Sequence, residues 1–175
     1  MGEVLSLKAG TFISALDIHS EESYEFPYPC FGGNGIRGYS ARANSEGDYV
    51  LIGRQGAWSG NVQRATGKFH ATEHAIVVTP MTELNTSWLY HELKWMNLNQ
   101  YVSAGAQPGL AVGNLNRLLL PVPTIEEQNR IAKILDRFEL LTKDLNVGLP
   151  AELAARRKQY EYYRDRLLTF DELVA

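Results

Sequence analysis

The chain has little of what a secreted or membrane protein needs. Its 175 residues contain one cysteine, Cys30, so no disulfide can form within the chain, as is usual in a reducing compartment. No segment approaches the ~20 consecutive apolar residues of a membrane span. Residues 1–20 lack the basic start and apolar stretch of a signal peptide. These absences predict a cytoplasmic protein.

A surplus of positive charge is also lacking. The net charge of −3 argues against indiscriminate binding of nucleic acid, which usually accompanies a basic surplus. The charges are unevenly spread, however. Residues 17–25 are acidic, whereas residues 30–70 carry mostly basic side chains, namely Arg37, Arg42, Arg54, Arg64 and Lys68 against Glu46 and Asp48. A positive face on a negative protein is therefore expected.

Recognisable catalytic motifs are scarce. The nucleophile-elbow pattern G-x-S-x-G is absent. His70, Glu73 and His74 match the H-x-x-E-H pattern of zinc peptidases, but that chemistry needs a helix, and the apolar run at 75–79 predicts a strand. Residues 33–38 spell G-x-G-x-x-G without the helix and acidic residue of a dinucleotide site, so a hairpin turn is expected. We expect no catalytic site, metal or cofactor.

The pattern along the chain changes near residue 122. Before it, short runs of β-branched and apolar residues predict strands, and residues 86–98 have helical spacing after a possible Asn85 or Thr86 cap. The predicted strands are residues 4–7, 49–52, 75–79 and 117–122. The sequence thus predicts an α+β fold: a mixed domain over residues 1–122, rich in short strands and loops, and long helices over residues 123–175.

Three glycine-rich clusters, at residues 32–35, 53–61 and 105–109, predict loops on the domain surface. The polar and aromatic side chains in and near them suit contact with DNA, because forked donors pair with base edges, basic groups hold phosphates and aromatic rings pack on bases or sugars. The candidate DNA-binding residues are Asn34, Arg37, Tyr39, Arg54, Gln55, Trp58, Asn61, Arg64, Lys68, Gln107 and Asn114. Surface amides and arginines are also common in ordinary turns.

The C-terminal third predicts two helices. Thr124 and Glu127 form a capping box, and apolar residues then recur at alternating four- and three-residue steps on both sides of a break at residues 148–150. This seam contains Ile131, Leu135, Phe138, Leu145, Leu153, Tyr160, Tyr163 and Leu167. The helices could fold back on each other as a hairpin, and the tyrosines at 160–163 leave a second face for an intermolecular bundle.

Several segments together resemble one family. Residues 120–132 (LPVPTIEEQNRIA) are similar to a junction in the specificity subunits of type I restriction-modification systems, and residues 148–165 are similar to their spacer helix. Residues 28–35, 52–56 and 72–75 resemble elements of their target-recognition domains. The resemblance implies a non-enzymatic subunit that reads half of a split double-stranded DNA target. It also implies docking of methyltransferase subunits and, through them, the restriction subunit, without S-adenosylmethionine or ATP.

A complete subunit of that family has two recognition domains, whereas this chain has one. It is therefore either a fragment or a half-subunit that forms a homodimer. A helix over residues 150–168 is ~28 Å long, about eight base pairs, which predicts an inverted repeat with a fixed gap of that order. Two alternatives remain: a coiled-coil adaptor that does not bind DNA, and a zinc hydrolase that uses His70, Glu73 and His74.

Overall fold

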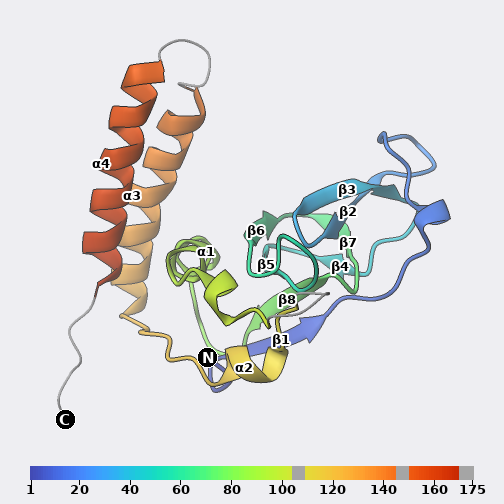
Figure 1. Ribbon diagram of the computed structural model, residues 1–175, viewed down its shortest axis with the longest axis horizontal. Coiled ribbons are helices and arrows are strands. Elements are labelled where there is room, and N and C mark those ends of the chain that lie inside the picture. The colour runs from blue at the N-terminus through green and yellow to red at the C-terminus, as the bar shows by residue number, and fades with distance from the viewer. Residues whose placement is uncertain (104–108, 145–149, 170–175) are drawn as a thin grey trace.

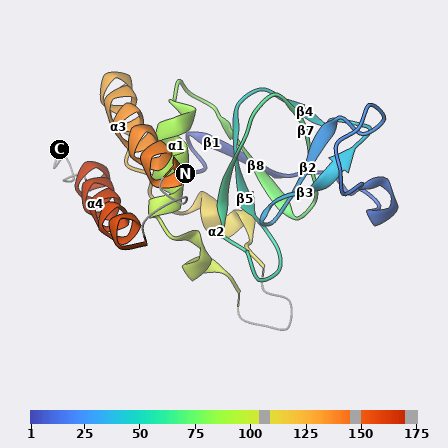
Figure 2. The ribbon, with the colours of Figure 1, turned by 90° about the horizontal axis from the view of Figure 1, so that it is seen from above.

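The computed structural model describes residues 1–103, 109–144 and 150–169. Two small sheets lie at one end of the molecule and a pair of long helices at the other, with helix α1 between them in both views (Figures 1 and 2). The first sheet is antiparallel, in the order β1-β8-β5-β6. Its strands are β1 (Leu5–Ala9), β8 (Ala75–Pro80), β5 (Tyr49–Gly53) and β6 (Val62–Ala65).

The second sheet has the order β3-β2-β7-β4, with a parallel pairing between β2 and β7. Its strands are β3 (Gly35–Ser40), β2 (Tyr28–Gly32), β7 (Lys68–Ala71) and β4 (Ser45–Glu46). Gly33 and Asn34 connect β2 to β3 as a tight hairpin, and Gly35 adopts a φ of +92° that suits glycine. The G-x-G-x-x-G segment is therefore a hairpin, as the sequence predicts.

Helix α1 (Thr86–Trp95) fills the space between the sheets and the long helices. The Asn85 side chain accepts a hydrogen bond from the Trp88 N–H and caps the helix, so the predicted cap and start are confirmed. A short 3-10 helix, η2 (Leu98–Tyr101), follows. Trp88 and Leu93 are fully buried in the main core with residues of the first sheet, which anchors the helix on that sheet.

The predicted strand at residues 117–122 is wrong. Helix α2 (Val112–Asn116) is followed by turn and irregular backbone up to α3. Leu118 and Leu120 pack against the core while Leu119 is 83% exposed, so the alternation of burial is real. Pro121 and Pro123 lack the N–H that a strand pairing requires, and the alternating segment serves as a connector along the core.

Helices α3 (Ile125–Asp144) and α4 (Pro150–Leu168) pack side by side as a hairpin (Figure 1). The Glu127 N–H donates to the Thr124 hydroxyl, which is one half of the predicted capping box, whereas the Glu127 carboxylate accepts from Arg130. Ile131 and Leu135 of α3 and Leu168 of α4 are buried in the same core as α1. Within the described residues, the helices lack the length and apolarity to cross a membrane. The predicted α+β class is confirmed.

Candidate nucleic-acid interface

Three loops that are far apart in the sequence meet at one edge of the sheets. They are the β2–β3 turn (residues 33–34), the β5–β6 loop (residues 54–61) and the β7–β8 turn (residues 72–74), and together they are called the loop cluster below. The Arg54 N–H donates to the His74 carbonyl at 2.8 Å, and the Asn61 side-chain amide donates to the Asn34 Oδ1 at 2.7 Å. These two hydrogen bonds join all three loops.

Glycine makes this convergence possible. A Cβ on Gly53 would collide with the carbonyl oxygens of Gly33 and Trp58, so only glycine lets the two loops approach so closely. Gly60 has a φ of +89°, and a Cβ there would meet the backbone of Leu98 and Asn99 in η2. The glycines predicted to form surface loops thus allow these loops to pack closely against one another.

The loop cluster presents amides, an arginine and an indole. Asn34 and Gln55 are exposed, Trp58 is 58% exposed, and Arg54 and Asn61 are half-buried. The Arg54 guanidinium donates to the Glu73 carbonyl at 3.3 Å, which holds the side chain while other donors of the fork stay available. The arginine and amide side chains offer paired donors and acceptors that suit base edges. The Trp58 ring beside them suits packing on a base or sugar.

A hollow of about 220 Å³ lies beside the cluster. It is lined by Arg54 and Gln55 together with Ser103, Gly109, Leu110 and Ala111. The Leu110 N–H donates to the Arg54 carbonyl at 2.8 Å, which ties the segment before α2 to the β5–β6 loop. Asn114, another candidate, is exposed on α2 in the turn after Ala111.

The other candidates lie outside the cluster or at its border. Arg37 is exposed on β3 and its side chain lies over Gly32, next to the β2–β3 turn. Tyr39 exchanges backbone hydrogen bonds with His19, in the segment that also carries the acidic residues. Lys68 is exposed on β7 and lies 3.9 Å from Glu46. Gln107 is outside the described residues.

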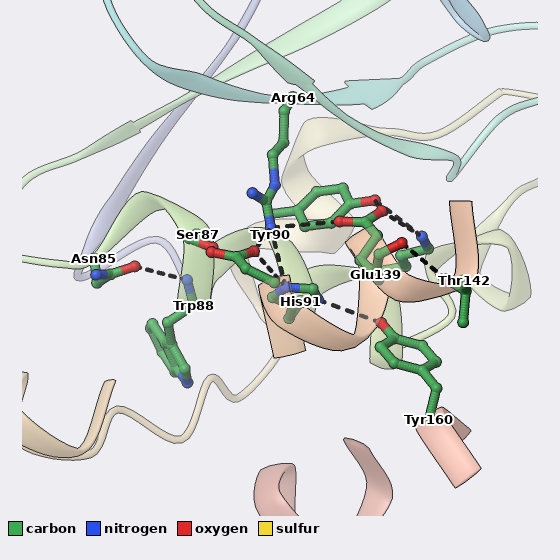
Figure 3. Close-up of polar contacts among 11 residues, drawn as sticks. Arg64, Asn85, Ser87, Trp88, Tyr90, His91, Glu139, Thr142 and Tyr160 are labelled. Carbon is green, nitrogen blue, oxygen red and sulfur yellow. Dashed lines mark hydrogen bonds and ion pairs between the residues drawn. The ribbon is translucent and has the colours of Figure 1, made fainter. Parts of the chain in front are cut away.

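Arg64, a candidate phosphate contact, is paired with acidic residues of its own chain. Its guanidinium lies 2.5 Å from Asp136 and 3.8 Å from Glu139, both on α3, and stacks over the Tyr90 ring at 4.1 Å. Its charge is balanced within the chain, which argues against a phosphate contact. Figure 3 shows Arg64 reaching from β6 toward Tyr90 and His91 of α1.

His91 is the buried centre of this group. Its Nε2 lies 3.0 Å from Asp136 and 3.0 Å from Arg64, and its Nδ1 lies 3.3 Å from the Tyr160 hydroxyl (Figure 3). Burial lowers the pKa of His91 to about 4, so the ring is neutral at pH 7. We assign its one N–H to Nε2, which then donates to Asp136 while Nδ1 accepts from Tyr160.

Asp136 stays ionised in this group. Burial alone would raise the pKa of its carboxyl, but hydrogen bonds from Ser87, Arg64 and His91 outweigh burial and hold it below its ordinary value. Burial and the neighbouring Glu139 carboxylate raise the pKa of Tyr90, and burial raises the pKa of Tyr160 to about 12, so both hydroxyls remain protonated donors. His91, Asp136 and Glu139 lie close enough to one another to bind a metal ion. The Arg64 guanidinium, however, already places a positive charge beside their carboxylates.

The residues of the H-x-x-E-H match do not share a helix. His70 lies on β7 with its Nδ1 3.2 Å from the Arg42 carbonyl, whereas Glu73 and His74 lie in the following turn, 3.2 Å from each other. The structure therefore contradicts the helical geometry that the zinc-hydrolase alternative needs.

Much of the predicted helix seam is used within the chain. Ile131 and Leu135 are fully buried, Tyr160 and Leu167 pack against the same core, and Phe138 stacks on Tyr163 at 5.4 Å. Leu145 is outside the described residues, and Leu153 is described only as part of the α4 backbone. Among the side chains that the structure describes, the large apolar ones that remain exposed on the hairpin are Leu140, Leu141, Tyr162 and Tyr163.

The joint between β6, α1 and α3 was not predicted from the sequence. Asp136 and Glu139 look like ordinary charged residues of an amphipathic helix. The sequence feature that could have indicated this contact is His91, a titratable residue within the apolar run of α1 between Trp88 and Leu93.

Comparison with known proteins gives a consistent match. Residues 1–155 match the family model of the type I restriction modification DNA specificity domain. The chain is 54% identical over 145 residues to the specificity subunit of the type I restriction enzyme EcoprrI of Escherichia coli, which covers 83% of this chain and 36% of that protein.

Solved structures show the same fold. The crystal structure of the type I restriction-modification S subunit from M. genitalium matches with a TM-score of 0.70 at 20% identity, over 83% of this chain and 39% of that one. The HsdS subunit from Thermoanaerobacter tengcongensis matches with a TM-score of 0.62 at 19% identity, over 95% of this chain and 43% of that one. The chain spans less than half of the length of each of these relatives.

Proposed function

The chain belongs to the family of type I restriction-modification DNA specificity domains, and on that basis we propose that it reads one half of a two-part DNA target. Residues 1–122 act as the recognition domain and residues 123–175 as the helical spacer. The chain works without catalysis of its own, in the cytoplasm, and docks methyltransferase subunits that in turn carry the restriction subunit. Methyl transfer and cleavage belong to those subunits.

The loop cluster is the observation that supports DNA reading. Hydrogen bonds from Arg54 to His74 and from Asn61 to Asn34 hold the three loops together, with Gln55 and Trp58 exposed beside them. Arginine pairs with guanine and amides pair with adenine in the major groove, so a fixed set of these side chains can discriminate bases. Arg37 borders the cluster and is suited to a phosphate or a base, whereas Tyr39 and Lys68 lie beside acidic residues and contribute less.

The helical hairpin supplies the docking surface in this proposal. Leu140 is 63% exposed and Tyr162 is 57% exposed, and Leu141 and Tyr163 add further exposed apolar area on the same hairpin. Residues of this size left in water are typical of surfaces that bind another protein. We assign them to a second specificity half, contributed by another copy of the chain, and to methyltransferase subunits.

Selection from random duplexes tests the proposal. The chain is assembled with the methyltransferase of its system and bound duplexes are recovered and sequenced. The expected result is enrichment of a split target whose two halves are separated by a fixed gap. A coiled-coil adaptor without DNA contact would enrich no sequence, and that outcome would reject DNA reading while leaving docking intact.

Arg54→Ala tests base reading at the loop cluster. Loss of a forked base contact is expected to cost about 1–3 kcal/mol of binding free energy and to relax one position of the selected sequence. Competition binding on duplexes that differ at one base measures both effects. Arg42→Ala is the matched control, because Arg42 is exposed outside the cluster, and it should leave base preference unchanged. Equal weakening by R54A on every duplex would instead make Arg54 a phosphate contact.

A further inference from the structure

The recognition domain is tied to the helical hairpin by polar contacts at two places on α3. At the first, the Asn85 N–H donates to Gln128 Oε1 at 2.9 Å and the Asn85 amide donates to Asn129 Oδ1 at 2.7 Å. At the second, Asp136 accepts from Arg64 and from the Ser87 hydroxyl, each at 2.5 Å. Residues 128 and 136 are about 12 Å apart along a helix. Two separated ties prevent the rotation that one tie would allow.

The second tie joins four elements at once. Arg64 belongs to β6, Ser87 and His91 to α1, Asp136 to α3 and Tyr160 to α4. Hydrogen bonds to ionised groups are strong and directional, so they fix an angle, whereas an apolar contact would permit sliding. The contribution of such a half-buried ion pair to overall stability is small, because desolvation offsets attraction. We expect the ion pair mainly to fix the orientation of the recognition domain relative to the hairpin.

Ile131 and Leu135 pack α3 onto the core, but the packing is incomplete further along the helix. A cleft of about 490 Å³ lies next to the second tie, between β6 and α1 on one side and α3 on the other. Its lining includes Val62, Gln63 and Tyr90 opposite the exposed Leu140. Because this space is an open cleft, this part of α3 has room to shift toward β6 once Asp136 no longer holds Arg64, with the Tyr90–Glu139 hydrogen bond at 3.0 Å as a remaining restraint.

The tie also lies close to the loop cluster in the sequence. Arg64 is three residues beyond Asn61, on strand β6, which follows the β5–β6 loop. A movement of this strand therefore also moves the loop. Any tilt between β6 and α3 therefore moves the loop cluster relative to the hairpin.

We propose that Arg64 and Asp136 are positioning residues that set how strictly the gap between two half-sites is measured. The proposal rests on the function proposed above. Gap length depends on the distance between two recognition domains, and base pairs are spaced 3.4 Å apart, so a tilt of a few ångströms at the joint shifts the preferred gap by a base pair. Base preference within each half-site depends on the loop cluster and is independent of the tie.

Asp136→Asn is the informative variant, because it keeps the side-chain shape and removes the nearer of the two carboxylates beside Arg64, at 2.5 Å, while Glu139 stays at 3.8 Å. Asp17→Asn is the matched control: it makes the same chemical change at an exposed aspartate of the acidic segment at residues 17–25, outside the loop cluster and the hairpin. Duplex selection with the assembled complex is expected to recover the same half-site bases for all three proteins. The D136N protein should accept about two or three gap lengths where the wild type and the control accept one.

A second readout needs no DNA. Spin labels are placed on cysteines introduced at exposed Lys8 of β1 and exposed Ala155 of α4, with buried Cys30 replaced by alanine. The distance distribution should be narrow in the wild type and in D17N, and about twice as wide in D136N, since a hinge that is released samples more angles. Thermal unfolding checks that each protein is folded.

Each outcome decides the proposal. Unchanged label distances in D136N, or a uniform loss of binding without a change in gap preference, would overturn it, because a merely stabilising role predicts those results. If the wild type enriches no sequence but D136N still widens the label distances, the function proposed above fails while the joint itself stands as described.

Discussion

Leu135→Ala is expected to destabilise the whole domain by about 2–5 kcal/mol, the usual cost of a buried leucine whose cavity does not collapse. Leu135 is fully buried on α3 and belongs to the same core as α1 and the first sheet. Chemical denaturation of the chain, followed by tryptophan fluorescence and circular dichroism, measures the change. Both signals should shift together, because the helix and the sheet unfold as one unit.

Leu140→Ala is the matched control on the same helix. Leu140 is 63% exposed, so its truncation should change the free energy of unfolding by less than about 0.5 kcal/mol. A similarly small loss for L135A would contradict the packing of α3 on the recognition domain. The α3–α4 hairpin would then be independent of the recognition domain, as expected if its apolar seam packed only against another molecule.

Glu92→Gln is expected to stabilise the protein at alkaline pH by an amount that grows as the pH rises. Glu92 is fully buried on α1, and within the described part of the chain neither carboxylate oxygen has a hydrogen-bond partner. Burial raises its pKa from 4.5 to about 8. Because the folded state holds the proton more tightly than the unfolded chain, stability is fully present below pH 4.5 and is lost as the pH rises toward 8.

Glutamine has nearly the same shape and cannot ionise, so the variant escapes this loss. The difference in unfolding free energy between E92Q and the wild type should grow by up to about 1.4 kcal/mol per pH unit between pH 5 and pH 8, several kcal/mol in all. Denaturant titrations at several pH values measure it. A difference that does not vary with pH would show that Glu92 is ionised and solvated in the folded protein.

His91 acts in the opposite direction. Its pKa is lowered from 6.5 to about 4, so its contribution is complete above pH 6.5 and is lost as the pH falls toward 4. In the wild type, the effects of Glu92 and His91 on the free energy of unfolding oppose each other between pH 4.5 and 6.5. The E92Q variant should therefore lose stability on acidification across this range.

The local features of the fold could be predicted because they depend on neighbouring residues. The Asn85 cap, the Thr124 capping box and the Gly33-Asn34 hairpin each need only a few consecutive residues with the right chemistry. The segment at 117–122 shows the limit of this approach. Its leucines alternate between buried and exposed as in a strand, but pairing depends on distant partners and on N–H groups that proline lacks.

The site could be predicted only in part for the same reason. The glycines of the loop cluster and their polar side chains were recognisable from composition. The role of Arg64 was not, because its partner Asp136 is 72 residues away and on an unremarkable charged face of α3. The seam prediction likewise identified Ile131 and Leu135 as apolar helix residues, but it could not show that α1 of the same chain covers them.

Hydrogen exchange on the assembled complex, with and without a selected duplex, tests most directly whether the loop cluster reads DNA. DNA should slow exchange of backbone amides at residues 33–35 and 54–61. Exchange in the acidic segment at residues 17–25 should be unchanged. Protection of that acidic segment with no change in the loop cluster would contradict the account.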